Sequence, residues 1–144
     1  MNWFAVQGVL FAAMLAAPFV QHAGVPLVVR AAGVLIATGG VVLEIAGYVA
    51  LGSSHSPRPT PATGAQLVRS GIYSRMRHPI YAGWCLFAIG FALTFGSLLG
   101  LAVAAAVLIY YDLRARTEER FLRERYPEYA TYMRSVRRFV PGIY

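Results

Sequence analysis

Apolar residues are grouped in long blocks along this chain, and short polar segments separate the blocks. The apolar runs cover about residues 3–20, 27–51, 80–95 and 98–111. A transmembrane helix needs about 20 apolar residues, within a range of about 17–25. The first two runs have this length, and the last two are shorter arms that meet at Gly96-Ser97. The pattern predicts an all-α integral membrane protein with about four transmembrane helices, of which the last two form a helical hairpin.

The first apolar run has two possible interpretations, a retained span or a cleaved signal peptide. Small residues near Ala16-Ala17 suit a cleavage site. However, no Lys or Arg precedes the run, and the run is long for the apolar region of a signal peptide. We therefore expect the first span to be retained.

A helical extension is expected after the fourth apolar run. Residues 112–125 contain neither Gly nor Pro, so the fourth helix should continue out of the membrane into the cytoplasm. Tyr126-Pro127 should end this helix, because the residue before proline disfavours the helical conformation. A last helix over 128–138 would be amphipathic and lie at the membrane interface. Its apolar face would carry Tyr129, Tyr132 and Val136, and Arg134, Arg137 and Arg138 would lie near headgroups.

The composition agrees with a membrane protein. Hydrophobic residues make up 58% of the 144 residues and charged residues 13%, against about 45–50% and about 25% in soluble domains. The net charge is +7, but the chain lacks the polar bulk of a soluble nucleic-acid-binding protein. All 13 basic residues are Arg, and 12 of them lie in 52–79 or after Tyr111. The positive-inside rule then places the N-terminus, the central loop and the C-terminus in the cytoplasm.

The length and the remaining composition predict one domain, residues 1–144, without a metal site. Ser53–Ala65 is rich in Ser, Pro, Thr and Gly and is expected to be a connecting loop rather than a domain boundary. The single cysteine, Cys85, excludes an internal disulfide and is expected to be a small buried hydrophobe. The chain has no Cys/His pattern with zinc-ligand spacing, and neither a Gly-x-Gly-x-x-Gly nor a Walker motif.

Three isolated polar residues need separate explanations. Glu44 lies inside the second span, where a carboxylate costs about 2.5–3.5 kcal/mol on insertion scales. It should face the protein interior beside a partner such as His55, Tyr48 or an Arg, and both a functional and a structural role are open. His22 and His55 are expected in loops, His22 on the solvent side.

A first polar cluster surrounds the start of the third span. Pro79 suits the first position of a helix, which makes His78 the cap residue. With Arg75 and Arg77 beside it, the helix start is suited to bind an anion. Tyr81 should lie one turn into the helix on the same side, and Gly71 and Gly83 allow the backbone to approach a ligand closely. The alternative is a set of ordinary interface residues with no ligand.

A second polar cluster, Glu118-Glu119, lies about two turns beyond the membrane exit. Adjacent side chains on a helix point about 100° apart, so one carboxylate can contact a ligand while the other pairs with an Arg. Alternatively, the acidic residues form only i,i+4 pairs, each worth about 0.2–0.5 kcal/mol. These pairs would be Arg114 with Glu118, Glu119 with Arg123, and Arg120 with Glu124.

The two clusters together resemble the isoprenylcysteine carboxyl methyltransferase family, which is related to the phospholipid N-methyltransferases. The resemblance covers about residues 50–144. It is carried by Leu67-Val68, Gly71-Ile72-Tyr73, Arg77-His78-Pro79-Ile80-Tyr81-Ala82-Gly83, Glu118-Glu119, Leu122, Tyr126-Pro127-Glu128-Tyr129, Tyr132, Arg138 and Pro141.

The resemblance implies an integral-membrane methyltransferase that uses S-adenosylmethionine. The cofactor pocket would be formed by about 67–83 and 112–141, with motif-matched contacts at His78, Tyr81, Glu118 and Glu119 and looser ones at Val68, Gly71 and Tyr73. An anion site suits the cofactor's carboxylate, a Glu acceptor suits its ribose, and a Tyr face suits its sulfonium. Arg77 and Arg138 are the candidates for holding a substrate carboxylate.

Carboxyl O-methylation of an isoprenylcysteine-like or other lipophilic substrate is the function that this resemblance favours. The substrate would enter from the bilayer, and no nucleic-acid partner is expected. Phospholipid or small-amine N-methylation is an alternative within the same class. Alternatives of other classes are a membrane reductase of related architecture, with arginines serving a nicotinamide dinucleotide phosphate, and a non-catalytic membrane protein.

Overall fold

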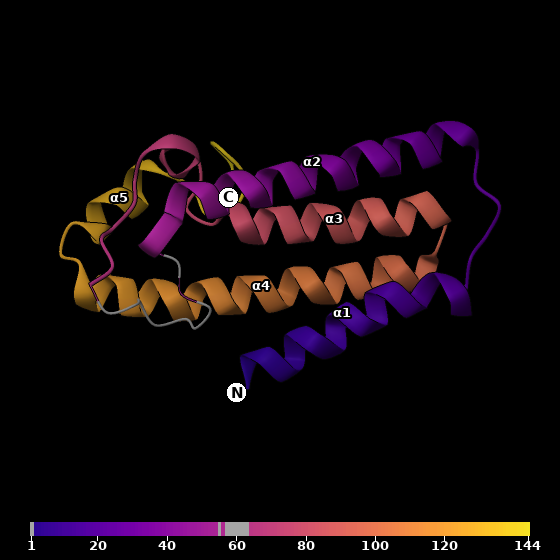
Figure 1. Ribbon diagram of the computed structural model, residues 1–144, viewed down its shortest axis with the longest axis horizontal. Helices are drawn as coiled ribbons and strands as arrows, with labels where there is room; N and C mark the ends of the chain where they lie inside the picture. The colour runs from indigo at the N-terminus through magenta and orange to yellow at the C-terminus, as the bar shows by residue number, and fades with distance from the viewer. Residues whose placement is uncertain (1, 55, 57–63) are drawn as a thin grey trace. The chain divides into compact units, whose positions relative to one another are not determined.

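The helices follow the order that the apolar pattern predicts. The structure is a computed structural model that describes residues 2–54, 56 and 64–144 (Figure 1). Over these residues the elements are α1 (Trp3–Val20), α2 (Leu27–Leu51), η1 (Gly52–Ser54), η2 (Gly71–Ser74), α3 (Pro79–Phe95), α4 (Leu98–Arg125) and α5 (Tyr129–Ser135). The prediction of an all-α protein is confirmed.

Three of the described helices are long and apolar enough to cross a membrane, judged by length and composition: α1, α2 together with η1, and α4. α3 is also apolar but has only 17 residues. The fourth apolar run continues as one helix to Arg125 and ends before Tyr126-Pro127, as predicted. The fold is therefore that of a multi-pass membrane protein with three to four membrane-length helices.

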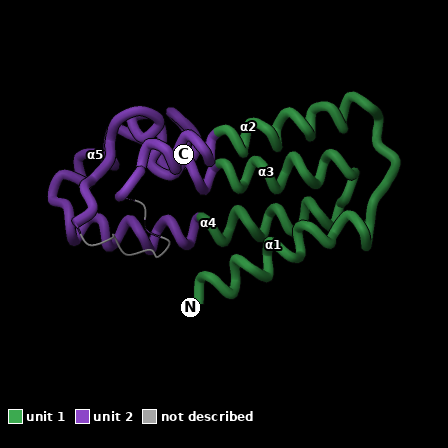
Figure 2. The backbone as a smooth tube through the Cα atoms, viewed as in Figure 1, with its two compact units in different colours: residues 1–42, 83–111 green, residues 43–82, 112–144 purple. Residues whose placement is uncertain are grey.

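The chain divides into two compact units (Figure 2). Unit 1 contains residues 1–42 and 83–111, and unit 2 contains residues 43–82 and 112–144. α2, α3 and α4 each contribute residues to both units. All nine side-chain and backbone contacts predicted above for the cofactor or the substrate belong to unit 2, whereas Gly83, at the end of the predicted pocket segment, belongs to unit 1.

In unit 1, α2 and α3 approach each other through glycines. A Cβ atom added at Gly33 would lie 2.6 Å from the backbone N of Thr94, and one added at Gly40 would lie 2.6 Å from the backbone O of Gly83. Small residues let membrane helices come this close. The two glycines are seven residues apart, so they lie on the same face of α2.

The turn between α3 and α4 confirms the predicted break at Gly96-Ser97. Gly96 has a φ of +63°, which favours glycine. Ser97 then caps α4, because its Oγ accepts a hydrogen bond from the backbone N of Gly100 at 2.9 Å. Gln21 supports the same end, since its Oε1 accepts from the backbone N of Leu99 at 3.0 Å.

The core of unit 2 is built on α5. Tyr129, Tyr132 and Val136 are buried together, as their predicted common face requires, and half-buried Leu67, Leu122, Tyr126 and Met133 pack against them. Burial raises the pKa of Tyr132 to about 12, and its hydroxyl donates to the backbone O of Tyr73 at 2.5 Å. This apolar face is therefore buried in protein rather than in lipid, and the location of α5 at the membrane interface stays a prediction.

The predicted end of the last helix, at 138, is wrong. α5 ends at Ser135, and Val136 is extended with φ −121° and ψ 134°. The chain then pairs with the segment before α3, because the backbone N–H groups of Arg77 and His78 donate to the carbonyls of Arg137 and Arg138 at 2.9 and 3.0 Å. This non-local pairing directs Arg138 into the protein instead of toward headgroups.

The predictions for the three isolated polar residues have different outcomes. His22 is exposed after α1, as predicted, with Nδ1 3.0 Å from the carbonyl O of Pro18. Glu44 is half-buried, and no hydrogen bond or ion pair reaches it from the described part of the chain. The expectations for His55 and for most of the loop Ser53–Ala65 fall outside the described residues.

Candidate active site

The first polar cluster forms at the start of α3, and its local structure follows from the sequence. Gly71 opens η2 with a φ of +59°, and Pro79 is the first residue of α3. The carbonyl O of His78 accepts from the backbone N of Ala82 at 3.0 Å, so the predicted cap is confirmed. Only 6% of His78 is exposed, so its imidazole points into unit 2 rather than into solvent.

Glu119 lies at the centre of a buried charged cluster. Its Oε1 accepts from Nε of Arg77 at 2.9 Å and from Nε2 of His78 at 3.1 Å. Its Oε2 accepts from Nη2 of Arg138 at 2.7 Å. Only 2% of Glu119 is exposed. Burial alone would raise the pKa of Glu119, but hydrogen bonds from His78, Arg138 and Arg77 hold that pKa well below its ordinary value.

The two arginines of this cluster have different second partners. Arg77 donates through Nη1 to the backbone carbonyls of Met133 and Val136 and so anchors the end of α5. Arg138 donates through Nη1 to Oδ1 of Asp112 at 2.7 Å. The side chain of Arg138 is 14% exposed and that of Arg77 is 7% exposed. Arg138 is therefore the arginine closer to solvent.

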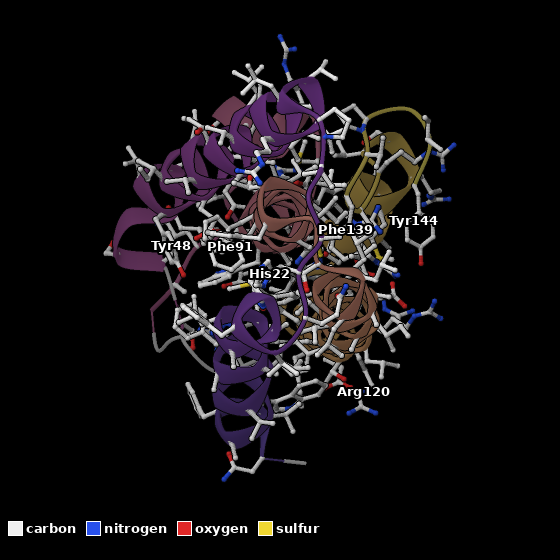
Figure 3. The ribbon with its side chains drawn as sticks, turned by 90° about the vertical axis from the view of Figure 1, so that its right-hand side faces the viewer. His22, Tyr48, Phe91, Arg120, Phe139 and Tyr144 are labelled. Carbon is white, nitrogen blue, oxygen red and sulfur yellow. The ribbon has the colours of Figure 1, made fainter. Side chains whose placement is uncertain are left out.

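Polar groups that include Tyr144 of the C-terminal segment lie at the edge of the cluster. The hydroxyl of Tyr144 donates to Oδ1 of Asp112 at 2.9 Å and accepts from Nη1 of Arg138 at 3.2 Å. The ring of Phe139 is tilted against that of Tyr144, with centroids 6.1 Å apart. Figure 3 labels both rings on this segment, and it shows Arg120 of α4 pointing away from the helix. The charged cluster thus has a buried centre and an exposed rim.

Glu118 forms a second, more accessible group. Its Oε2 accepts from the hydroxyl of Tyr81 at 2.7 Å, and Nε of Arg114 donates to the same hydroxyl at 3.1 Å. The ring of Tyr81 stacks on the imidazole of His78, with centroids 5.2 Å apart and planes 6° apart. The side chain of Glu118 is 28% exposed, against 3% for Glu119. The two adjacent carboxylates point in different directions and differ in exposure, but they share His78, whose Nδ1 lies 3.9 Å from Oε2 of Glu118 and whose Nε2 lies 3.1 Å from Oε1 of Glu119.

The structure brings together six of the nine predicted site residues: Arg77, His78, Tyr81, Glu118, Glu119 and Arg138. The other three predicted residues, Val68, Gly71 and Tyr73, form no hydrogen bond, ion pair or ring contact with these six in the described part of the chain. Tyr73 is buried, with its hydroxyl 3.4 Å from the carbonyl O of Gly47, Gly71 supplies the turn, and Val68 is half-buried. The predicted pairing of Glu119 with Arg123 is wrong, because other cations occupy the Glu119 carboxylate and Arg123 reaches only its backbone carbonyl, at 3.4 Å.

Three residues of the site were missed from the sequence: Asp112, Tyr144 and the buried Arg114. Asp112 offered a signal, because it lies seven residues before Glu119 and hence on the same face of α4. The sequence indicates Arg114 only as an i,i+4 partner of Glu118 on the helix surface. The sequence contains no signal for Tyr144. Its contact with Asp112 depends on the pairing between 76–78 and 137–138.

The fold and the cluster define a class, an all-helical membrane protein with a charged site at the start of one helix. A solved structure has the same fold. The structure of the eukaryotic intramembrane Ras methyltransferase, an isoprenylcysteine carboxyl methyltransferase, superposes with a TM-score of 0.77 at 21% identity. The match covers 99% of this chain and 55% of that one.

The sequence comparisons identify the family. Residues 28–129 match the phospholipid methyltransferase family. The chain belongs to this family.

The individual proteins that are similar in sequence include a metal-resistance protein and two methyltransferases. The cobalt-zinc-cadmium resistance protein CzcN of Cupriavidus metallidurans is 42% identical over 54% of this chain and 36% of its own length. The protein-S-isoprenylcysteine O-methyltransferase of Saccharomyces cerevisiae is 35% identical over 62% of this chain and 38% of its own length. The human protein of that name is 29% identical over 77% of this chain and 42% of its own length. The chain thus spans less than half the length of these relatives.

Proposed function

We propose that this protein is an S-adenosylmethionine-dependent methyltransferase with its cofactor site in unit 2 and a lipophilic methyl acceptor. Carboxyl O-methylation of an isoprenylcysteine-like substrate is the preferred reaction, because two relatives carry that activity in their names. One observation carries the proposal. Glu118, whose side chain is 28% exposed, accepts a hydrogen bond from half-buried Tyr81 directly beside the buried cluster around Glu119.

The two adjacent glutamates would have different tasks. All described donors on Glu119 are cationic side chains or His78, and its carboxylate is almost fully buried. We therefore assign Glu119 to positioning Arg77, His78 and Arg138. Glu118 is partly exposed and accepts one hydrogen bond from Tyr81, so its carboxylate has acceptor capacity for a ribose diol.

Tyr81 and the two arginines of the cluster also have the chemistry that the cofactor and the acceptor require. The Tyr81 ring stacks on His78, and Cζ of Arg114 lies 5.6 Å from its centroid. A sulfonium that replaced the Arg114 guanidinium there would be stabilised by a cation–π interaction. Arg138, the more exposed arginine, is assigned to the acceptor carboxylate, while Arg77 is committed to Glu119 and to the end of α5. When bound, S-adenosylmethionine supplies an electrophilic methyl group. A carboxylate acceptor has no proton to lose, so the residues around it need only to orient it and to exclude water.

The cytoplasmic orientation of unit 2 remains part of this proposal and is supported by the arginine distribution. Unit 2 contains 12 of the 13 arginines, and the positive-inside rule assigns such segments to the cytoplasm. A cofactor dissolved in the cytoplasm would then reach the site from water, whereas a lipophilic acceptor would reach it from the bilayer.

Calorimetry with S-adenosylhomocysteine tests the cofactor site in protein reconstituted in nanodiscs. We expect binding by the wild type, and at least tenfold weaker binding, about 1.4 kcal/mol, by Glu118→Gln and by His78→Ala. Glu124→Gln is the matched control, because Glu124 is an exposed carboxylate on the same helix. Unchanged affinity in both site variants would contradict the proposed site.

A methyl-transfer assay with labelled donor and a whole lipid extract tests the reaction, and product identification names the acceptor. Transfer to a carboxylate would support O-methylation, and transfer to an amine would support the N-methyltransferase alternative. Binding of the reduced nicotinamide dinucleotide phosphate without binding of S-adenosylhomocysteine would instead favour the membrane reductase.

A further inference from the structure

Arg138, which is assigned above to the acceptor carboxylate, already uses most of its own hydrogen-bond donors. Its Nε and Nη2 donate to Oε1 and Oε2 of Glu119 at 3.3 and 2.7 Å. Its Nη1 donates to Oδ1 of Asp112 at 2.7 Å and to the hydroxyl of Tyr144 at 3.2 Å. These four hydrogen bonds use four of the five N–H donors of a guanidinium. A carboxylate that binds Arg138 through two hydrogen bonds must therefore displace one of the present acceptors.

Glu119 is not the acceptor that a ligand can displace. Its side chain is 3% exposed, and it also accepts hydrogen bonds from Arg77 and His78. Its two oxygens lie along the Nε–Nη2 edge of Arg138, in the paired geometry that makes guanidinium–carboxylate contacts strong. Withdrawing Glu119 would leave charged donors inside the protein without their acceptor, which is more costly than losing a hydrogen bond at the surface.

Asp112 has two properties of a displaceable acceptor. Its side chain is 21% exposed, so water can solvate the carboxylate when it leaves Arg138. It also has a second cationic partner, because Nε of Arg116 donates to its Oδ2 at 2.6 Å. Arg116 lies one turn further along α4, and its side chain is 60% exposed. Asp112 can therefore leave Arg138 and remain paired with Arg116 at the surface.

The position that Oδ1 of Asp112 occupies is suited to a carboxylate oxygen of any origin. Nη1 of Arg138 and the hydroxyl of Tyr144 both donate to this oxygen, at 2.7 and 2.9 Å. The guanidinium of Arg138 also lies against the ring of Tyr144, with Cζ 5.7 Å from the ring centroid, so the two donors support each other. Tyr144 is 48% exposed. The position therefore lies at the accessible edge of the charged cluster.

We propose that Asp112 occupies the binding position of the acceptor carboxylate and is displaced from Arg138 when the acceptor binds. Arg116 holds Asp112 in the displaced state and is therefore a positioning residue. The inference rests on the proposed function, because it takes Arg138 as the residue that binds the acceptor. It adds that competition between two carboxylates for Arg138 determines the affinity for the acceptor.

Ligand binding tests this competition without methyl transfer. Calorimetry measures the affinity of the full chain in phosphatidylcholine nanodiscs for N-acetyl-S-farnesylcysteine and for its carboxamide, which has the same tail and a neutral head group. The ratio of the two affinities reports the contact of the charge, because both ligands share the tail. We expect the wild type to bind the acid at least threefold more tightly, since a bidentate pair is stronger than the single contact of Asp112 with Nη1 of Arg138.

Asp112→Asn should raise the acid-to-amide ratio at least threefold further, because a neutral side chain competes less well for a guanidinium. Glu124→Gln is the matched control and should leave the ratio unchanged, since Glu124 is an exposed carboxylate on the same helix. If Asp112 only stabilised the edge of the cluster, its replacement would not raise the ratio. An unchanged or lower ratio in Asp112→Asn would overturn the proposal.

Arg116→Gln is the second test, and its expected effect has the opposite sign. Without Arg116, Asp112 loses its alternative partner and stays on Arg138, so the acid-to-amide ratio should fall at least twofold. Because Arg116 is mostly exposed, this variant tests the proposal even if Asp112→Asn does not fold. Arg120→Gln is the matched control and should leave the ratio unchanged, since Arg120 is exposed and points away from α4 (Figure 3).

The double variant separates two possible roles of Arg116. In the Asp112→Asn background, Arg116→Gln should leave the ratio unchanged, because the carboxylate that Arg116 would hold is gone. A fall of the same size in both backgrounds would mean that Arg116 binds the acceptor itself, and it would overturn the proposal.

Methyl transfer distinguishes a failure of this inference from a failure of the proposed function. If the wild type neither binds S-adenosylhomocysteine nor transfers methyl groups, but the ratios change as expected, the proposed function fails and the displaceable carboxylate stands. If methyl transfer occurs while wild type and Asp112→Asn both bind the acid no more tightly than the amide, the inference fails and the proposed function stands. Where both hold, KM for the acid should fall at least threefold in Asp112→Asn.

Discussion

In unit 1, α2 and α3 meet at Gly33 and Gly40, where the backbones nearly touch, whereas in unit 2 charged side chains converge on Glu119. The first arrangement needs the absence of side chains, and the second needs long side chains whose hydrogen bonds replace water. A glycine contact can form between apolar helices inside a bilayer at no cost in desolvation. A buried carboxylate is stable only when its partners are all in place. Mutations in the two units should therefore lower the stability of the protein for different physical reasons: added volume in unit 1, and loss of a partner for buried charges in unit 2.

The largest effect is expected at the centre of the charged cluster. Glu119→Gln removes the charge that faces Arg77, His78 and Arg138 while keeping the size of the side chain. Breaking a buried ion pair by removing one partner costs about 3–5 kcal/mol, and we expect about 3 kcal/mol because both arginines keep other acceptors. Thermal unfolding in detergent measures this loss. Glu124→Gln, with its exposed side chain, should shift the midpoint by less than a tenth as much.

The pH dependence of this loss identifies its cause. The pKa of Glu119 is below its ordinary value of 4.5 in the folded protein, so its stabilisation is fully present above about pH 4.5 and is lost as the pH falls below that value. The difference in unfolding free energy between wild type and Glu119→Gln should therefore be present at pH 5 and should shrink toward pH 3. A difference that does not depend on pH would mean that packing, rather than charge, is lost.

A smaller effect is expected in unit 1. Gly40→Ala places a Cβ atom 2.6 Å from the carbonyl O of Gly83, and forcing extra volume into a close contact costs about 1–3 kcal/mol. Gly39→Ala is its matched control, because Gly39 precedes it on the same helix and an added Cβ meets no atom within 4 Å. The same unfolding assay should show a loss for Gly40→Ala and no loss for Gly39→Ala. Equal behaviour of the two variants would contradict the close packing of α2 on α3.

These two regions also differ in how far the sequence predicts them. Runs of apolar residues identify helices directly, so α1 and α2 begin and end where their runs do, and Gly96-Ser97 marks the hairpin turn. The faces through which these helices pack could not be predicted. Gly33 and Gly40 have the spacing of a common helix face, but glycines are frequent in membrane helices, and a packing partner becomes evident only in three dimensions.

The charged cluster was predictable in its members but not in its connections. Pro79 and the Glu118-Glu119 pair indicate where polar groups gather, and the different directions of the two carboxylates follow from helix geometry. Which carboxylate is buried depends on Arg138, and Arg138 reaches Glu119 only because the chain turns extended at Val136. Local propensity cannot show this, since 128–138 has a helical apolar pattern and the pairing of 137–138 with 76–78 is a contact between segments far apart in sequence.

The smallest effect is expected at the rim of the charged cluster. Tyr144→Phe removes a hydroxyl that bonds Asp112 and Arg138 but leaves their direct contact of 2.7 Å intact. Tyr144 is 48% exposed, and exposed polar contacts are screened by water and salt. We expect a loss of about 0.5 kcal/mol or less, and none at 1 M salt, where the Debye length is about 3 Å.

Unfolding curves of Tyr144→Phe and Glu119→Gln, measured side by side at low and high salt, separate rim from centre. The effect of Glu119→Gln should persist at 1 M salt, because salt screens a buried group much less. A loss in Tyr144→Phe as large as that in Glu119→Gln would contradict the distinction. It would mean that the contacts of the C-terminal segment, and not the neutralisation of a buried carboxylate, determine the stability of unit 2.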